Sequence, residues 1–313
     1  MGSNPTGPAF FPLARTKQRF LGKALRGGKA IRDGGSSMKG GTTLSTQPLS
    51  SRSVSVAQSN LVEFFRYWGS SKLVRRHDSP GLSWIESNLD FSLFNQVFLT
   101  KLRPEAAEEA IEEVLSNFET RSLTFEWPVL PGTEPADLPA RLGRHGFIFE
   151  GDKPAMVIDL KRLTANPSPP AKLLIRKIES DEDLQVFMHV TKRAFEVSNR
   201  DHGVFLDILR SLGVGSRSRY ECYLGILDGQ PVATSMLFRT GRVAGVYWIG
   251  TVPEGRGKGV GTQMTMKPLL DARKAGLGIA TLQATAMGEP VYRRVGFEDC
   301  FRFGVYIHRH IPQ

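Results

Sequence analysis

The sequence predicts an α/β protein whose C-terminal part holds an anion-binding loop between a strand and a helix. A strand-like run over 243–252 leads through Pro253-Glu-Gly-Arg-Gly-Lys-Gly-Val-Gly261 into a helix-like segment over 262–275. A second apolar run over 279–284 follows, and then Pro290-Val-Tyr-Arg-Arg-Val-Gly-Phe297. The free N–H groups and the positive dipole end of a first helical turn favour a phosphate, and glycines let the backbone approach it closely.

The glycine-rich loop does not fit two common phosphate-binding fingerprints. A Walker loop fails because Lys258 is followed by Gly259. A dinucleotide fingerprint fails because its third glycine would fall on Val260 or Thr262, and too little chain follows for a doubly wound sheet. The pattern R-x-x-G-x-G fits Arg256, Gly259 and Gly261, with a solvated basic turn as the alternative.

With this loop and the segment Tyr292-Arg-Arg-Val-Gly-Phe297, residues 171–313 resemble the GNAT family, the GCN5-related N-acetyltransferases. The two motifs stand in the family's order, and the chain between them has room for one helix and one strand. The resemblance implies a mixed, mostly antiparallel sheet flanked by helices. It also implies a loop that holds the pyrophosphate of acetyl-coenzyme A.

Charge and composition narrow the function classes. The net charge of +10 divides into +8 for residues 1–60, −4 for residues 61–170 and +6 for residues 171–313. Most of the basic excess therefore lies in a tail, and no ordered element combines basic and aromatic residues as a nucleic-acid surface would. No apolar run is long enough to span a membrane, so we expect neither nucleic acid nor membrane as a partner. Cys222 and Cys300 fit thiols in a reducing compartment better than a disulfide.

Residues 1–55 have the composition of a disordered basic tail, rich in Gly, Ser and Thr. The tail could be an upstream extension with Met38 as the true start, an organelle transit peptide, or a plain tail. The first six residues also match a myristoylation pattern, which short sequences match by chance. We expect a cytoplasmic protein, with an organelle matrix as the alternative if the tail is a transit peptide.

Residues 56–165 read as a separate α/β unit. We expect helices over 60–68, 104–118 and 136–145, with Gly146 in the C′ position, and strands over 91–99, 123–129, 147–150 and 155–159. This order resembles a degenerate second GNAT module, and Asn95, the Trp127-Pro128 pair and Met156 resemble the N-terminal half of two-module bacterial members. The unit has no R-x-x-G-x-G loop, so it would be structural or form one wall of the acceptor cleft. The fold is therefore predicted to be a tandem one.

Residues 166–170 contain three prolines and are predicted to be a linker to the GNAT-like domain over 171–313. Within that domain we expect a strand over 173–178, a helix capped by Ser180 and a second helix over 202–212. The segments 221–227 and 231–238 then predict a β-hairpin.

The resemblance assigns a role to each part of the candidate site. Tyr292 would protonate the leaving thiolate, since a phenol can do so at modest thermodynamic cost; a core tyrosine packed on Phe297 is the alternative. A main-chain N–H of Ile249, Gly250 or Thr251 would stabilise the oxyanion, and Val252 would pair with the pantetheine arm. Backbone N–H groups of the loop would face the pyrophosphate, and Arg256 and Lys258 would add positive charge. The loop positions expected to hold the cofactor are Arg256, Gly257, Lys258, Gly259, Val260, Gly261 and Thr262.

Other positions are less specific. Thr285 stands where the family often has Asn or Ser, and Arg293 and Arg294 could approach the adenosine phosphate or be solvated. The general base could be Glu254, Glu221 or a water chain. The histidines, His189, His202, His308 and His310 among them, show no metal-binding pattern, so we expect no metal.

These residues predict an acetyl-CoA-dependent N-acetyltransferase that transfers the acetyl group to a primary amine by direct attack in a ternary complex. The alternative is a non-catalytic acyl-CoA sensor or scaffold, and a longer acyl chain is also open. The amine is not identified by the sequence, although the acidic middle segment hints at a cationic one. A homodimer is possible.

Overall fold

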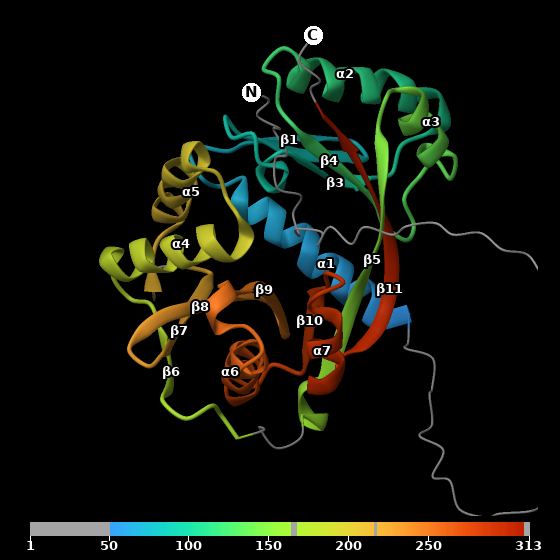
Figure 1. The fold of residues 1–313 in the computed structure, drawn as a ribbon. Coiled ribbons are helices and arrows are strands. Elements are labelled where there is room, and N and C mark those ends of the chain that lie inside the picture. Colours follow the sequence, from blue (N-terminus) through green and yellow to red (C-terminus); the bar gives the residue numbers. More distant parts are fainter. Residues whose placement is uncertain (1–50, 164–167, 216–217, 310–313) are drawn as a thin grey trace, which may run out of the picture.

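The computed structural model describes residues 51–163, 168–215 and 218–309 (Figure 1). Within them, eleven strands form one sheet in the order β1-β2-β3-β4-β11-β5-β10-β9-β8-β7-β6. Neighbouring strands are antiparallel except for β3–β4 and β9–β10. The predicted mixed, mostly antiparallel sheet flanked by helices is therefore confirmed.

The elements of the first half begin with a long helix and end with a long strand. They are α1 (Ser51–Trp68), β1 (Arg75–Ser79), β2 (Leu82–Glu86), β3 (Gln96–Thr100), α2 (Ala107–Glu119), β4 (Phe125–Val129), α3 (Leu138–Arg144) and β5 (Ile148–Asp159).

The second half repeats this order of helices and strands after one additional strand and one additional helix. Its elements are β6 (Leu173–Lys177), α4 (Asp181–Phe195), α5 (Asn199–Leu212), β7 (Tyr220–Leu227), β8 (Gln230–Thr240), β9 (Val243–Thr251), α6 (Val260–Lys274), β10 (Ile279–Gln283), α7 (Glu289–Val295) and β11 (Glu298–His308).

The two halves of the chain exchange their last strands. β5, from the first half, pairs with β10 of the second half, and β11, from the second half, pairs with β4 of the first. β5 and β11 also pair with each other and run side by side through both halves of the molecule (Figure 1). The segments on either side of the predicted linker consequently share one sheet.

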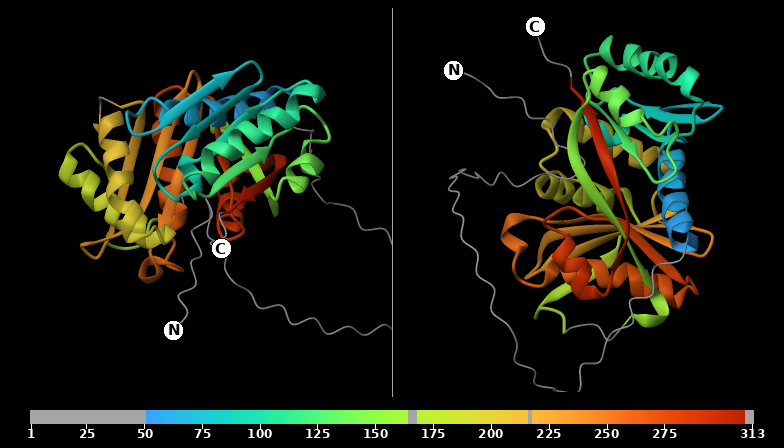
Figure 2. Two further views of the ribbon diagram at one scale, coloured as in Figure 1. Left: turned by 90° about the horizontal axis from the view of Figure 1, so that it is seen from above. Right: turned by 90° about the vertical axis from the view of Figure 1, so that its right-hand side faces the viewer.

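Helix α1 belongs to the first half but packs on the sheet of the second. The ring of Phe64 stacks on Tyr247 of β9 at 3.8 Å between centroids. The buried Asn60 amide donates to Thr240 Oγ1 at 2.7 Å and accepts from the Tyr247 hydroxyl at 2.8 Å. Gly245 makes room for this contact, because a Cβ there would lie 2.1 Å from Asn60 Oδ1. Figure 2 shows α1 (blue) alongside the β5–β11 ribbon.

Helices α4 and α6 cover opposite faces of the second half of the sheet. On one face a Cβ at Gly225 would meet Met264 of α6 at 2.7 Å, and on the other a Cβ at Gly250 would meet Phe195 of α4 at 2.5 Å. Phe238 lies four residues along β8 from Thr234, the partner of Gly250, so it shares the α4 face. Its ring contacts Phe64 of α1 at 5.5 Å, which puts α1 and α4 on the same face and α6 on the opposite one.

Several predicted elements differ from the observed ones. The predicted strand over 91–99 is wrong at its start: Ser92–Phe94 is a 3₁₀ turn, and the strand begins only at Gln96. The strands predicted over 147–150 and 155–159 are one continuous strand, β5. The helix predicted over 60–68 begins at Ser51, so the last five residues of the predicted tail are helical. The β1–β2 hairpin was not predicted, because β1 is almost entirely exposed and carries no apolar alternation.

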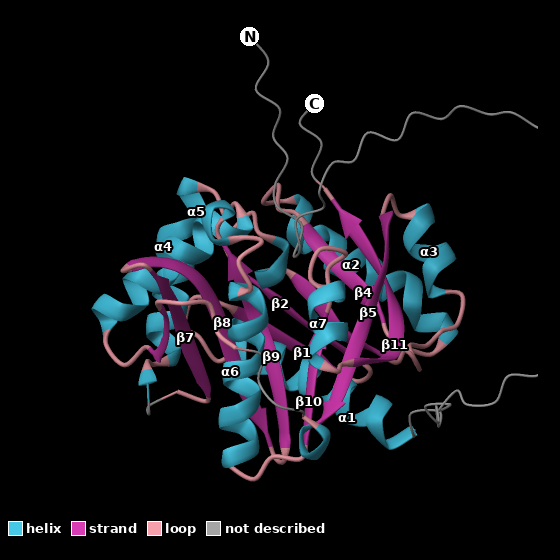
Figure 3. Cartoon of the chain, turned by 60° about the horizontal axis from the view of Figure 1, so that its bottom comes forward, coloured by secondary structure: helices cyan, strands magenta, loops and turns pink. Residues whose placement is uncertain are grey.

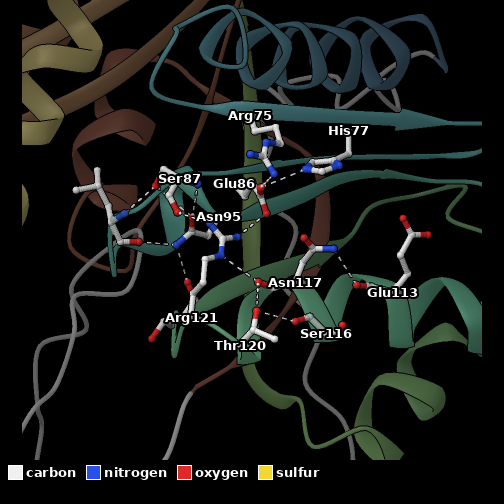
Figure 4. Close-up of polar contacts among 12 residues, drawn as sticks. Arg75, His77, Glu86, Ser87, Asn95, Glu113, Ser116, Asn117, Thr120 and Arg121 are labelled. Atoms are coloured by element: carbon white, nitrogen blue, oxygen red, sulfur yellow. Dashed lines mark hydrogen bonds and ion pairs between the residues drawn. The ribbon is translucent and has the colours of Figure 1, made fainter.

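A polar network holds the loop between β2 and β3 against the end of α2 (Figure 4). The buried Glu86 carboxylate pairs with Arg121 and, at 3.2 Å, with Arg75. Asn95 accepts from the Ser87 N–H at 2.9 Å and donates to the carbonyl oxygens of Leu89 and Thr124. Because these polar groups satisfy one another, we interpret the network as structural.

Two global features concern the described residues alone. None of the helices in these ranges is long and apolar enough to cross a membrane. Cys222 is a buried free thiol and Cys300 a partly exposed one.

Candidate functional site

Strands β9 and β10 start side by side and then separate. Their parallel pairing extends from Val243–Ile279 to Gly245–Thr281, the last pair within the described residues. Beyond that point β9 has a bulge against β8, and Trp248 takes a left-handed φ of 53°. The Thr234 hydroxyl donates to the Trp248 carbonyl oxygen at 3.1 Å and supports the bulge. The sheet therefore opens between the ends of two adjacent strands.

A cavity of about 460 Å³ occupies this opening. Figure 3 shows α6 and α7 beside β9 and β10. The cavity brings together ten of the residues predicted from sequence, which are Ile249, Gly250, Thr251, Arg256, Gly257, Gly259, Gly261, Thr262, Thr285 and Tyr292. These positions come from one strand, two loops and two helices, so chain segments from 249 to 292 meet at a single site.

The loop at the mouth of the cavity has the shape of an anion cradle. Gly257 and Gly259 have φ values of 73° and 76°, which side chains rarely adopt, and α6 begins directly after Gly259. The first N–H groups of a helix have no intrahelical partner, and Gly261 and Thr262 of this first turn line the cavity. A Cβ on Gly261 would meet only Thr251 Oγ1, at 3.8 Å, so the space beside it is open.

Two arginines add positive charge to the cavity wall. Arg256 donates from Nε to the Thr251 carbonyl oxygen at 3.0 Å, which fixes the loop against the end of β9. Arg294 of α7 also lines the cavity. Arg293 does not, since it pairs with Glu289 and Asp299 on the exposed side of the helix. Arg293 and Arg294, which the sequence analysis could not distinguish, therefore have different surroundings.

Four predicted site residues lie outside the cavity lining. Val252 donates its N–H to the Val232 carbonyl oxygen at 2.9 Å, so the sheet already uses the group expected to pair with pantetheine. Glu254 is 63% exposed and pairs with Arg193 at 2.5 Å. Lys258 is exposed and Val260 is buried, and neither lines the cavity.

Glu221, the second candidate base, belongs to a different cluster. Its carboxylate pairs with Arg239, with Lys177 at 2.6 Å, and accepts from the Tyr223 hydroxyl at 2.9 Å. The same hydroxyl lies 3.0 Å from Asp271 Oδ2 of α6, so the two carboxylates share its single proton. The cluster ties α6 to β6, β7 and β8. Among the described residues that line the cavity, none carries a carboxylate or an imidazole.

Tyr292 is held in the cavity wall by its neighbours. Its side chain is 8% exposed, and burial raises the pKa of the phenol above its ordinary value. A Cβ at Gly288 would lie 2.7 Å from Tyr292 Cε2 and 2.9 Å from its hydroxyl oxygen, so the ring covers a glycine that leaves room for it. Its ring also contacts Phe297 at 6.2 Å, so it has the core contact expected of the alternative interpretation as well.

Thr285 lies before the helix that carries Tyr292, and its hydroxyl oxygen accepts from the Gly288 N–H at 3.0 Å.

The strand leading to Tyr292 contributes Gln283, a residue that the sequence analysis missed. Gln283 lines the cavity at 6% exposure, and neither atom of its amide has a hydrogen-bond partner within the described ranges. A polar residue inside an apolar strand was the only available signal. The cavity is also lined by apolar side chains, including Phe195, Trp248 and Val291.

No metal site accompanies this cavity within the part of the chain that the structure describes, where no three His, Cys, Asp or Glu side chains form a group that could hold an ion. The cradle of glycines and the two arginines fit a phosphorylated organic ligand.

The chain is similar to known proteins in sequence and in fold. Residues 175–300 match the family model described as an acetyltransferase (GNAT) domain. No curated protein matches the chain. Among solved structures, a GCN5-related N-acetyltransferase from Kribbella flavida is 20% identical with a TM-score of 0.63, over 82% of this chain and 96% of that one.

Two further structures are also similar over both halves of the chain. A GCN5-related N-acetyltransferase from Sphaerobacter thermophilus is 15% identical with a TM-score of 0.58, over 83% of this chain and 91% of that one. A tandem GNAT protein from the clavulanic acid biosynthesis pathway is 14% identical with a TM-score of 0.54, over 86% and 91%. At these identities the likeness establishes the shared fold.

Proposed function

We propose that the protein, whose residues 175–300 match the model of a GNAT acetyltransferase domain, is an N-acetyltransferase that moves the acetyl group of acetyl-CoA to a primary amine. The observation that carries the proposal is the cavity between β9 and β10, which joins the glycine loop of α6 to Tyr292. Direct attack by the amine while both substrates are bound is the simplest route, because no cysteine or serine nucleophile lines the described cavity.

The loop and the two arginines would hold the donor. N–H groups of Gly257, Gly261 and Thr262 would face the diphosphate, and Arg256 and Arg294 would complement its charge. Bound there, acetyl-CoA would supply an acyl thioester to the centre of the cavity. The β9 edge at Ile249, Gly250 and Thr251 would then offer main-chain donors to the thioester oxygen.

Tyr292 would act as the acid. A raised pKa keeps its phenol protonated at neutral pH, so a proton is available for the departing thiolate. No side chain that lines the described cavity can take the proton from the amine at neutral pH, because it holds neither carboxylate nor imidazole. We propose that water carries this proton away, and Glu254 and Glu221 remain in their own ion pairs.

The test is the appearance of acetylated product. Purified protein is incubated with acetyl-CoA and a panel of primary amines, and mass spectrometry looks for a mass gain of one acetyl group on any amine. Product from at least one amine, absent without protein, supports the proposal. Binding of acetyl-CoA without any product over a broad panel would contradict transfer.

The second candidate is a protein that binds acyl-CoA without turning it over. It is favoured by the absence of a carboxylate and an imidazole from the described cavity lining. Measurements of melting temperature and free thiol on the same mixtures separate the two candidates. Acetyl-CoA would raise the melting temperature of a sensor, but neither free thiol nor acetylated product would appear.

A further inference from the structure

Gln283 is a buried polar side chain with no partner. It ends β10, is 6% exposed and lines the cavity. Its Nε2 and Oε1 both lack a hydrogen-bond partner among the residues that the structure describes. Leaving a buried amide unpaired costs folding free energy, so such a group at a cavity wall points to a ligand that completes it.

Gln283 faces the side of the sheet opposite to Tyr292. Thr281 pairs with Gly245, which is covered by Asn60 of α1, so Thr281 faces α1. Side chains two residues apart on a strand share a face, so Gln283 faces the side of α1 and α4. Tyr292 comes from α7, which ends next to Gly296. A Cβ at Gly296 would lie 3.4 Å from Ile158 Cδ1, and Ile158 is the partner of Ala280 on the other face. The cavity therefore passes through the sheet from the donor loop to Gln283.

The chemistry of the far end is neutral and apolar. Ala194 and Phe195 of α4 and Trp248 of β9 line the cavity with Gln283. An amide side chain offers donors at Nε2 and an acceptor at Oε1. A cationic group would pair only with Oε1, and a carboxylate only with Nε2. A carboxamide or a hydroxyl pairs with both atoms, because each can donate and accept.

We propose that Gln283 selects the amine acceptor, which carries a carboxamide or hydroxyl group that pairs with this amide while its apolar part lies against Phe195 and Trp248. The proposal rests on the proposed acetyl transfer and names the acceptor class for it. It replaces the cationic acceptor suggested by the charge of the middle segment, since no acid lines the described cavity.

The first test uses the protein without ligand. Gln283→Met removes the unpaired amide at similar volume, so its melting temperature should rise by about 1–3 °C. Thr281→Val is the matched control, because Thr281 is buried on the same face with an unpaired hydroxyl but does not line the cavity. A fall in the melting temperature of Gln283→Met would mean that the fold itself pairs the amide, and would overturn the proposal.

The second test compares three amines with acetyl-CoA as donor: phenylalaninamide, phenethylamine and spermidine. The wild type should prefer phenylalaninamide over phenethylamine by about ten-fold in kcat/KM, the value of one hydrogen-bonded group. Gln283→Met should reduce that ratio to about one, whereas Thr281→Val should keep it. The Kd of acetyl-CoA, measured by calorimetry, should stay within about two-fold in both variants.

Each other outcome overturns the proposal. A ratio that Gln283→Met leaves unchanged, a wild-type preference for spermidine, or no turnover of phenylalaninamide would exclude the acceptor class. A loss of acetyl-CoA affinity in Gln283→Met would assign the amide to the donor. If the wild type binds no acetyl-CoA at all, the proposed function has failed instead, which distinguishes the two cases.

Discussion

At the scale of single residues, the proposed chemistry depends on Tyr292 and on Gly288, which leaves room for the tyrosine ring. The sequence could identify Tyr292 because it stands in a short motif, Tyr-x-x-x-Gly-Phe, that reads locally. It could not identify Gln283, because the role of that side chain depends on which face of β10 it occupies and on where β9 separates from β10. It also could not separate Arg293 from Arg294, since neighbours on one short helix differ only in the direction they face.

Replacing Tyr292 with Phe removes the hydroxyl and leaves the ring. General acid catalysis contributes about 10²–10⁴-fold, so kcat should fall by at least about 100-fold while the Kd of acetyl-CoA hardly changes. Steady-state kinetics and calorimetry check the two quantities separately. A variant as fast as the wild type would remove Tyr292 from the mechanism.

Gly288→Ala should disturb Tyr292 without touching it chemically. The new Cβ would lie 2.7 Å from Cε2 of the tyrosine ring, closer than real contacts allow, so the ring must move. We expect a loss of kcat that approaches that of Tyr292→Phe, with folding retained. Gly278→Ala is the control, because a Cβ there meets nothing within 4 Å. Equal activity of both alanine variants would show that the position of the ring does not matter.

The pH dependence of kcat follows from the raised pKa of Tyr292. The acid form is the protonated phenol, which predominates below its pKa, and burial moves that pKa upward. The acid should therefore stay protonated throughout the range up to about pH 10, the ordinary phenol value. A falling limb of kcat below about pH 9 that is present in the wild type and absent from Tyr292→Phe would contradict this assignment.

At the scale of elements, the strand–loop–helix unit was predictable and the long-range pairings were not. The loop from Arg256 to Gly261 and the hairpin of β7 and β8 depend on local turn chemistry, which the sequence displays directly. The insertion of β5 between β10 and β11 involves strands more than 100 residues apart, and nothing in the local pattern of β5 names its partners.

Helix α1 supplies an element-scale prediction. A chain that begins at Ser51 keeps the stack of Phe64 on Tyr247 and the hydrogen bonds of Asn60, whereas a chain that begins at Gly69 loses them. Burial of such aromatic side chains contributes several kcal/mol together, so we expect the longer chain to fold and the shorter one to be insoluble or unfolded. Circular dichroism and size-exclusion chromatography provide the measurement. Cooperative melting of the chain that begins at Gly69 would mean that the second half is stable without α1.

At the scale of the whole molecule, the exchanged strands make the two halves one cooperative unit. The linker prediction at 166–170 marks where the chain passes from one half to the other, yet the sheet is continuous across that point. Residues 171–313 alone would leave one edge of β10 and both edges of β11 unpaired, because β5 pairs with both strands and β4 is the other partner of β11.

The fragment of residues 171–313 should therefore neither fold nor bind acetyl-CoA by itself. Production together with residues 51–165 should restore a soluble complex, since the second fragment supplies β5 and α1. Thermal unfolding of the full chain should show one transition by circular dichroism and calorimetry. Two separate transitions, or a folded isolated fragment, would mean that the halves are independent.

The most direct measurement of the central claim is a calorimetric titration of acetyl-CoA into the wild type and into Gly261→Val. The valine enters open space at the start of α6, so the fold should be kept while the anion cradle is filled. We predict saturable binding to the wild type and a loss of at least about 100-fold in affinity for Gly261→Val, with Gly203→Ala, on an open face of α5, binding as the wild type does. Equal affinity for all three proteins, or no saturable heat with the wild type, would contradict the assignment of the cavity to the acyl donor.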